Sequence, residues 1–135
     1  MVHLLLFEST MPVVTTQSSS KVIGCAIKVH KALGPGLFES VYEPCLAHEM
    51  AKAGVRFERQ VILPITYGEV LVERAFRLDL IVESDLIVEI KSIENFSPLH
   101  TKQLVTYMKL SGIRKGLLIN FNVTLLKHGL KSVVL

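Results

Sequence analysis

Residues 70–91, VLVERAFRLDLIVESDLIVEIK, carry the clearest structural pattern in this 135-residue chain. Two runs of apolar residues, 70–82 and 86–91, flank the short polar segment 83–85. Alternation with a period of two is typical of strands, and a short polar segment between two such runs is typical of a hairpin. The stretch therefore predicts two antiparallel strands joined by a tight turn.

The same alternation predicts which side chains of the hairpin share a face of the sheet. On the first strand the apolar face consists of Phe76, Leu78, Leu80 and Val82. On the opposite face are Arg77, Asp79 and Ile81. With the turn at 83–85, the expected cross-strand pairs are Val82 with Leu86, Asp79 with Glu89 and Arg77 with Lys91. The β-carbons of such pairs lie about 4.5–5.5 Å apart, so two carboxylates are expected to meet.

Asp79 and Glu89 are the most informative pair because like charges directly opposite each other destabilise a sheet. A hard divalent cation removes that conflict, since carboxylate oxygens suit magnesium, manganese and calcium. Lys91 is expected on the face of Glu89, about 7 Å further along the strand. Its ammonium can position a water molecule or stabilise charge on a phosphoryl group. Alternatively, both acids are solvated on an outer sheet face and Lys91 is their counter-charge.

Helical and strand patterns flank this hairpin on both sides. Helices are expected at 18–33, 37–53 and 98–110, and further strands at 56–67, 116–121 and 132–135. The order α-α-β-β-β-α-β-(β) predicts an α/β fold with a mixed sheet flanked by helices. We expect a loosely ordered leader at 1–17 and one domain at 18–135.

Composition excludes several classes of protein. Half of the residues are apolar and a fifth are charged, which excludes a disordered or collagen-like chain. The formal net charge of +3 allows a polyanionic partner without requiring one. No stretch reaches the roughly 18 apolar residues of a membrane span, so no membrane partner is expected. Two cysteines, Cys25 and Cys45, indicate free thiols in a reducing, cytoplasmic compartment.

Two glutamates lie one turn apart at the start of the second expected helix. Glu39 begins a stripe that continues with Tyr42 and Leu46. A carboxylate at the end of a core-facing stripe is costly unless it is paired or bound to a cation. We therefore expect Glu39 to be paired or bound to a cation. Glu43 is either its neighbour or solvated, with solvation favoured, and Tyr42 is expected to lie in the core.

Gln103 and Tyr107 lie at positions i and i+4 of the third expected helix and share a face with His100 and Leu110. This polar stripe is either plain surface or a set of side chains that hydrogen-bond phosphate oxygens or the nearby carboxylates.

Together, these residues resemble the motifs of the PD-(D/E)XK nuclease superfamily. Residues 36–42, GLFESVY, are similar to the signature of the bacterial GxxExxY proteins, as are ALGPG at 32–36 and LINFN at 118–122. The resemblance covers about residue 20 to the end of the chain. One departure is Leu78-Asp79, which stands where the superfamily has proline-aspartate.

The resemblance implies a restriction-endonuclease-like core and a Mg- or Mn-dependent phosphodiesterase that acts on DNA or RNA. It implies that Asp79, Glu89 and Glu39 hold the metal or its water shell and that Lys91 is the catalytic lysine. Gln103 and Tyr107 would match the extra motif of an exonuclease-like branch, where they would position the substrate.

Two other functions remain open. One is a catalytically silent nucleic-acid-binding or assembly module of the same fold, and the other is a metal-dependent hydrolase of a small phosphoester. The complete set of Glu39, Asp79, Glu89 and Lys91 argues against the silent module. A homodimer or a partner protein could supply specificity, because a chain of this length leaves little room for a targeting domain.

Overall fold

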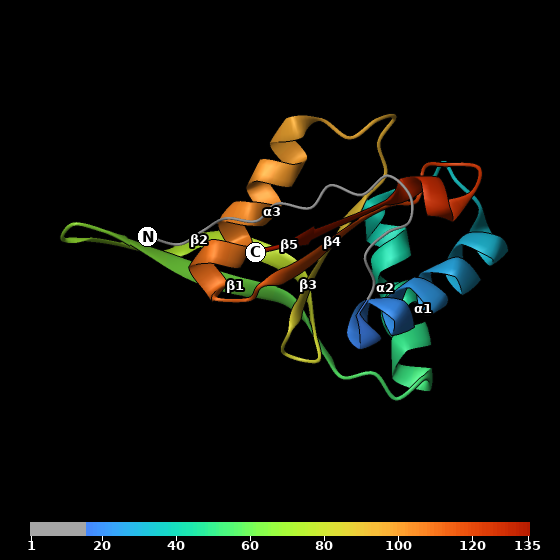
Figure 1. The fold of residues 1–135 in the computed structure, drawn as a ribbon, viewed down its shortest axis with the longest axis horizontal. Helices are drawn as coiled ribbons and strands as arrows, with labels where there is room; N and C mark the ends of the chain where they lie inside the picture. The colour runs from blue at the N-terminus through green and yellow to red at the C-terminus, as the bar shows by residue number, and fades with distance from the viewer. Residues whose placement is uncertain (1–15) are drawn as a thin grey trace.

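The computed structural model of this chain describes residues 16–135 (Figure 1). Its elements are α1 (Gln17–Leu33), α2 (Glu39–Lys52), β1 (Phe57–Tyr67), β2 (Val70–Val82), β3 (Leu86–Lys91), α3 (Pro98–Ser111), β4 (Lys115–Asn120), the 3-10 helix η1 (Leu126–Gly129) and β5 (Leu130–Val134). The predicted order is confirmed, and η1 is an addition to it. The expected leader at 1–17 lies outside the described residues except for Thr16, which caps α1, and Gln17, which begins it.

One mixed five-stranded sheet, ordered β1-β2-β3-β4-β5, forms the centre of the fold. β3 and β4 are parallel and all other neighbours are antiparallel. Parallel neighbours need a crossover connection, and α3 supplies it between β3 and β4. The predicted α/β class is confirmed. No helix within residues 16–135 is long and apolar enough to cross a membrane.

Helices cover the sheet on both faces (Figure 1). Helices α1 and α2 pack on one face, where Leu80, Val88 and Ile90 join their core. Helix α3 packs on the other face against a second core that includes Leu78 and Ile87. Both faces are therefore apolar over the middle of the sheet.

The predicted hairpin turn at 83–85 is confirmed. Val82 pairs with Leu86, and the Asp85 amide donates to the Val82 carbonyl at 3.1 Å. Glu83 and Ser84 have φ values of 52° and 56°, in the left-handed region. A tight connection with positive φ matches the right-handed twist of the two strands that it joins.

The predicted face of β2 is wrong in its first half. Leu80 and Val82 lie in the core beneath α1 and α2, whereas Phe76 and Leu78 contact the core beneath α3. The strand thus changes face at Asp79. β1 changes face at the facing position, Gln60, whose φ of 53° is left-handed and which has no partner in the ladder with β2. The register of the ladder itself shifts further along, between Leu63 and Ile65.

Candidate functional site

Asp79 and Glu89 meet at the point where β2 and β3 separate. The ladder between these strands ends at the pair Leu80–Val88, so the expected Arg77–Lys91 pair does not form. Beyond this pair, backbone amides of the two strands donate hydrogen bonds to carboxylate side chains of the facing strand instead of to its carbonyl groups. The Asp79 amide donates to Glu89 Oε2 at 3.2 Å, and the Ile90 amide donates to Asp79 Oδ2 at 2.9 Å. Buried backbone N–H groups need such acceptors, so the exchange holds the two acids side by side.

Glu89 is a buried acid with a strongly perturbed titration. Its side chain is 5 % exposed. Burial, followed by the hydrogen bond and the charge of the Asp79 carboxyl, raises the pKa of Glu89 to about 9. The charge of Lys91 opposes this shift. A carboxyl that is this costly to ionise is well suited to a site that receives a cation.

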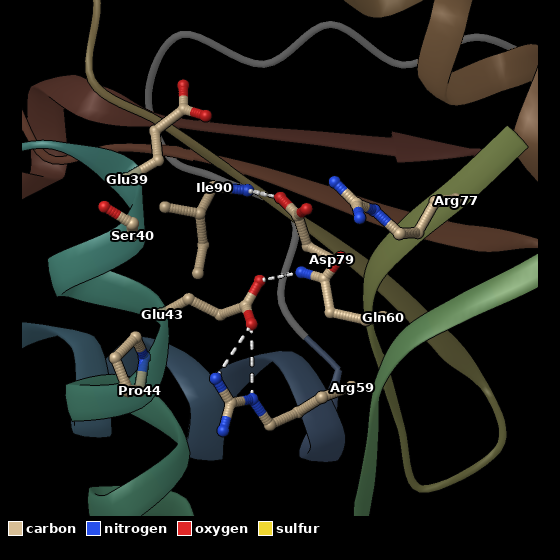
Figure 2. A pocket seen from close by; sticks show the side chains of 9 residues that line it. All are labelled: Glu39, Ser40, Glu43, Pro44, Arg59, Gln60, Arg77, Asp79 and Ile90. Carbon is tan, nitrogen blue, oxygen red and sulfur yellow. Dashed lines mark hydrogen bonds and ion pairs between the residues drawn. The ribbon is translucent and has the colours of Figure 1, made fainter.

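A pocket of about 420 Å³ opens beside this acid pair (Figure 2). It is lined by Glu39, Ser40, Glu43, Pro44, Arg59, Gln60, Arg77, Asp79 and Ile90. Helix α2 forms one wall and strands β1 and β2 form the other. The face change at Gln60 and Asp79 is what directs Asp79 into this space, because Leu78, the preceding residue, faces α3.

Glu39 lies across the pocket from Asp79. It is the first residue of α2, is exposed, and accepts a hydrogen bond from the Ser92 amide at 3.3 Å. Among residues 16–135, no three or more His, Cys, Asp or Glu side chains are grouped so that they could hold one metal ion. The structure therefore brings Asp79 and Glu89 together and leaves Glu39 on the opposite wall.

Tyr42 holds the loop that precedes Glu39. Its hydroxyl donates to the Gly34 carbonyl at 2.7 Å and accepts from the Leu37 amide at 3.1 Å. Its ring is fully buried and stacks on Phe121 with centroids 4.4 Å apart. Tyr42 thus lies in the core, as expected, and also fixes the path of the chain into α2.

Replacing Tyr42 with Phe is expected to lower the free energy of unfolding by about 1–3 kcal/mol, because two partners of the hydroxyl lose a hydrogen bond. Urea denaturation of both proteins measures the difference. Tyr67→Phe is the matched control, since Tyr67 is 81 % exposed on the β1–β2 hairpin. Equal losses in the two variants would contradict a role for the Tyr42 hydroxyl.

Glu43 is not solvated, contrary to the expectation from sequence. It is 8 % exposed, pairs with Arg59 at 3.0 Å and accepts a hydrogen bond from Gln60 Nε2. The stripe along α2 showed that Glu43 lies one turn from Glu39, but its partners come from β1 and became visible only in the fold. The contacts of Glu43 with Arg59 and Gln60 link α2 to β1 at the residue where β1 changes face.

The two substrate-positioning candidates on α3 have different surroundings. Tyr107 is half-buried and stacks on Phe76 with centroids 4.7 Å apart. Burial, then the charges of Glu89 and Asp79, raises the pKa of Tyr107. Gln103 is exposed one turn earlier. His100 accepts from the Ser97 amide at 2.9 Å and caps α3.

The donor chemistry of this site fits magnesium or manganese. Mg²⁺ is usually bound by one or two carboxylates and keeps several waters, and Asp79 and Glu89 supply two adjacent carboxylates. Gln60, which lines the pocket together with Asp79, carries a buried Oε1 atom without a hydrogen-bond partner. An acceptor of this kind needs a donor, such as an ordered water.

Comparison with known proteins gives one family. The family model of the PD-(D/E)XK nuclease superfamily matches residues 16–133. No curated protein and no solved structure matches the chain. The match spans all three helices and all but the end of the last strand, and it includes each acid of the site. The chain belongs to the PD-(D/E)XK nuclease superfamily.

Proposed function

We propose that the protein is a Mg- or Mn-dependent nuclease of the GxxExxY group, hydrolysing phosphodiester bonds in DNA or RNA. One observation carries this proposal: half-buried Asp79, which lines a solvent-open pocket, exchanges hydrogen bonds with buried Glu89 and its neighbour Ile90, and the charge of Lys91 acts on Glu89. Membership of the superfamily supports a nucleic-acid substrate, since that superfamily generally hydrolyses phosphodiester bonds.

Each of the three residues that define the GxxExxY signature, Gly36, Glu39 and Tyr42, has a distinct place in the fold. Gly36 has a φ of 94°, in the left-handed region that glycine adopts readily. Tyr42 anchors the same loop through its hydroxyl, and Glu39 lies between them at the pocket. The spacing of the three residues therefore couples a glycine turn, a pocket acid and a core anchor.

Each residue of the site has a role in the proposal. Asp79 and Glu89 hold the metal, which when bound lowers the pKa of a water ligand and neutralises phosphate charge. Lys91 orients the attacking water and stabilises negative charge on the phosphate. Glu39 lies on the opposite wall and acts through water in the outer shell.

Substrate positioning is assigned to α3. Tyr107, which is electrostatically coupled to the acid pair, would donate its hydroxyl to a phosphate oxygen, and Gln103 would follow it along the exposed face of the helix. Lys102 is exposed on the same helix and would attract the phosphate backbone. Exposed lining residues, including Glu39, Ser40 and Arg77, leave the pocket open to solvent and favour a polymer over a small phosphoester.

The test is a digest of single- and double-stranded DNA and RNA with Mn²⁺, with EDTA as the control. We expect cleavage of at least one of these substrates with Mn²⁺ and none with EDTA. Absence of cleavage by protein that demonstrably binds the metal would contradict the proposed nuclease. Hydrolysis of a small phosphoester under the same conditions would favour the alternative substrate class.

A further inference from the structure

Arg77 is a cation of the pocket that has no role in the proposed catalysis. It lies on β2 in the regular ladder with β1, where it pairs with Ile62. Its neighbours Phe76 and Leu78 contact the core beneath α3, so alternation sends Arg77 to the opposite face. Figure 2 shows its guanidinium extending over the pocket on the side of Asp79. The ladder pairs on either side of Arg77 hold its backbone in place.

The two arginines of the pocket differ in how they are neutralised. Arg59 donates two hydrogen bonds to Glu43, at 3.0 Å and 3.2 Å, so the Glu43 carboxylate compensates its charge. Arg77 is exposed, and within residues 16–135 no carboxylate forms an ion pair with it. In the described part of the pocket, Arg77 is thus the cation that remains available to a ligand.

We propose that Arg77 binds a phosphate group of the nucleic-acid strand next to the Asp79–Glu89 centre. A guanidinium offers a planar fork of donors that matches two phosphate oxygens, and it stays charged at all relevant pH values. The inference rests on the proposed function and deepens it, because it assigns a contact that holds the strand across the pocket.

The position of Arg77 along β2 supports a phosphate other than the one attacked. Arg77 and Asp79 are two residues apart on one strand, so their backbones lie about 7 Å from each other. The reacting phosphate must lie at the acid pair and Lys91. A guanidinium anchored two residues away would then hold a phosphate next to the reacting one and fix the path of the strand.

The test compares Arg77→Gln with Arg74→Gln, both in the Lys91→Ala background so that the nucleic acid stays intact. Arg74 is exposed on the same strand and does not line the pocket, so it is a control for the loss of one charge. Fluorescence anisotropy with labelled DNA and RNA oligonucleotides, in Mg²⁺ at several salt concentrations, measures the affinity. Thermal melting checks that all variants fold.

We expect Arg77→Gln to lose about ten- to a hundredfold in affinity, as for hydrogen bonds to a charged group. The slope of log affinity against log salt should fall by about one, and Arg74→Gln should change neither value appreciably. Unchanged affinity in Arg77→Gln, or equal losses in both variants, would overturn the phosphate contact while the nuclease proposal stands. A Lys91→Ala parent that binds no nucleic acid would overturn both.

Discussion

Replacing Lys91 with alanine is expected to lower the cleavage rate constant by roughly 10²–10⁴-fold, the range for a lost proton-transfer or water-positioning group. Affinity for the metal and for nucleic acid should change little. The reason is that Lys91 acts on the water and on charge that develops in the transition state, so its loss affects the rate more than binding. Single-turnover digestion with Mn²⁺ measures the rate constant, and anisotropy with the same oligonucleotides measures the affinity.

Lys109→Ala is the matched control, because Lys109 is an exposed lysine in the last turn of α3. It should cleave at the rate of the unmodified protein. Cleavage by Lys91→Ala at the rate of the control would mean that another site, or a contaminating nuclease, produces the activity.

The metal-free protein is expected to lose stability as the pH rises, because of Glu89. An ordinary glutamate has a pKa of 4.5, and in the fold the pKa of Glu89 rises to about 9. Between these two values the folded state holds more protons than the unfolded state, so the free energy of unfolding falls with increasing pH. At pH 7 the free energy of unfolding is lower by on the order of 3 kcal/mol than it is below pH 4.5, where Glu89 is protonated in both states.

Glu89→Gln should flatten this pH dependence and melt at a higher temperature than the unmodified protein at pH 8 without metal. Millimolar Mg²⁺ should raise the melting temperature of the unmodified protein by mass action, and should have no such effect on Glu89→Gln.

Asp79→Asn should likewise stabilise the metal-free protein and abolish the metal effect. Glu69→Gln, an exposed change in the β1–β2 turn, is the control. If the melting temperature of the unmodified protein does not change at any Mg²⁺ concentration, this result would contradict a metal site at Asp79 and Glu89.

The register of the hairpin was predictable from sequence because it depends on local features. Alternating residues and a polar turn at 83–85 fix which residues of β2 and β3 face each other, and Val82 does pair with Leu86. The same count brings Asp79 to Glu89, although a hydrogen bond of the Asp79 amide to the Glu89 side chain replaces the ladder pair. Proximity of the acids therefore followed from a pattern within a few residues.

The face change at Asp79 could not be predicted, because helices cover both faces of the sheet. Leu78 and Leu80 are both fully buried although they contact different helices. An apolar side chain is suitable on either side, so the sequence carries no sign of the switch. The left-handed backbone of Gln60 was equally hidden, since glutamine is not among the residues, chiefly glycine and then asparagine and aspartate, that indicate positive φ in a sequence.

The burial of Glu43 depends on distant partners. The helical pattern gives its position relative to Glu39, but Arg59 and Gln60 belong to β1. Whether a charged residue is solvated or buried in an ion pair is decided by the packing of α2 on the sheet, which periodicity does not describe. The role of the Tyr42 hydroxyl was hidden for another reason, since its partners at Gly34 and Leu37 are close in sequence but belong to a loop whose path periodicity does not describe.

Anomalous scattering from crystals of the protein soaked in Mn²⁺ tests whether Asp79 and Glu89 bind the metal. We expect a manganese peak between the carboxylates of Asp79 and Glu89, with Glu39 reaching the ion only through water. The same soak of Glu89→Gln crystals should show no peak at this position. A peak elsewhere, or none at Asp79 and Glu89 when manganese is bound in solution, would contradict the assignment of the acid pair as the metal site.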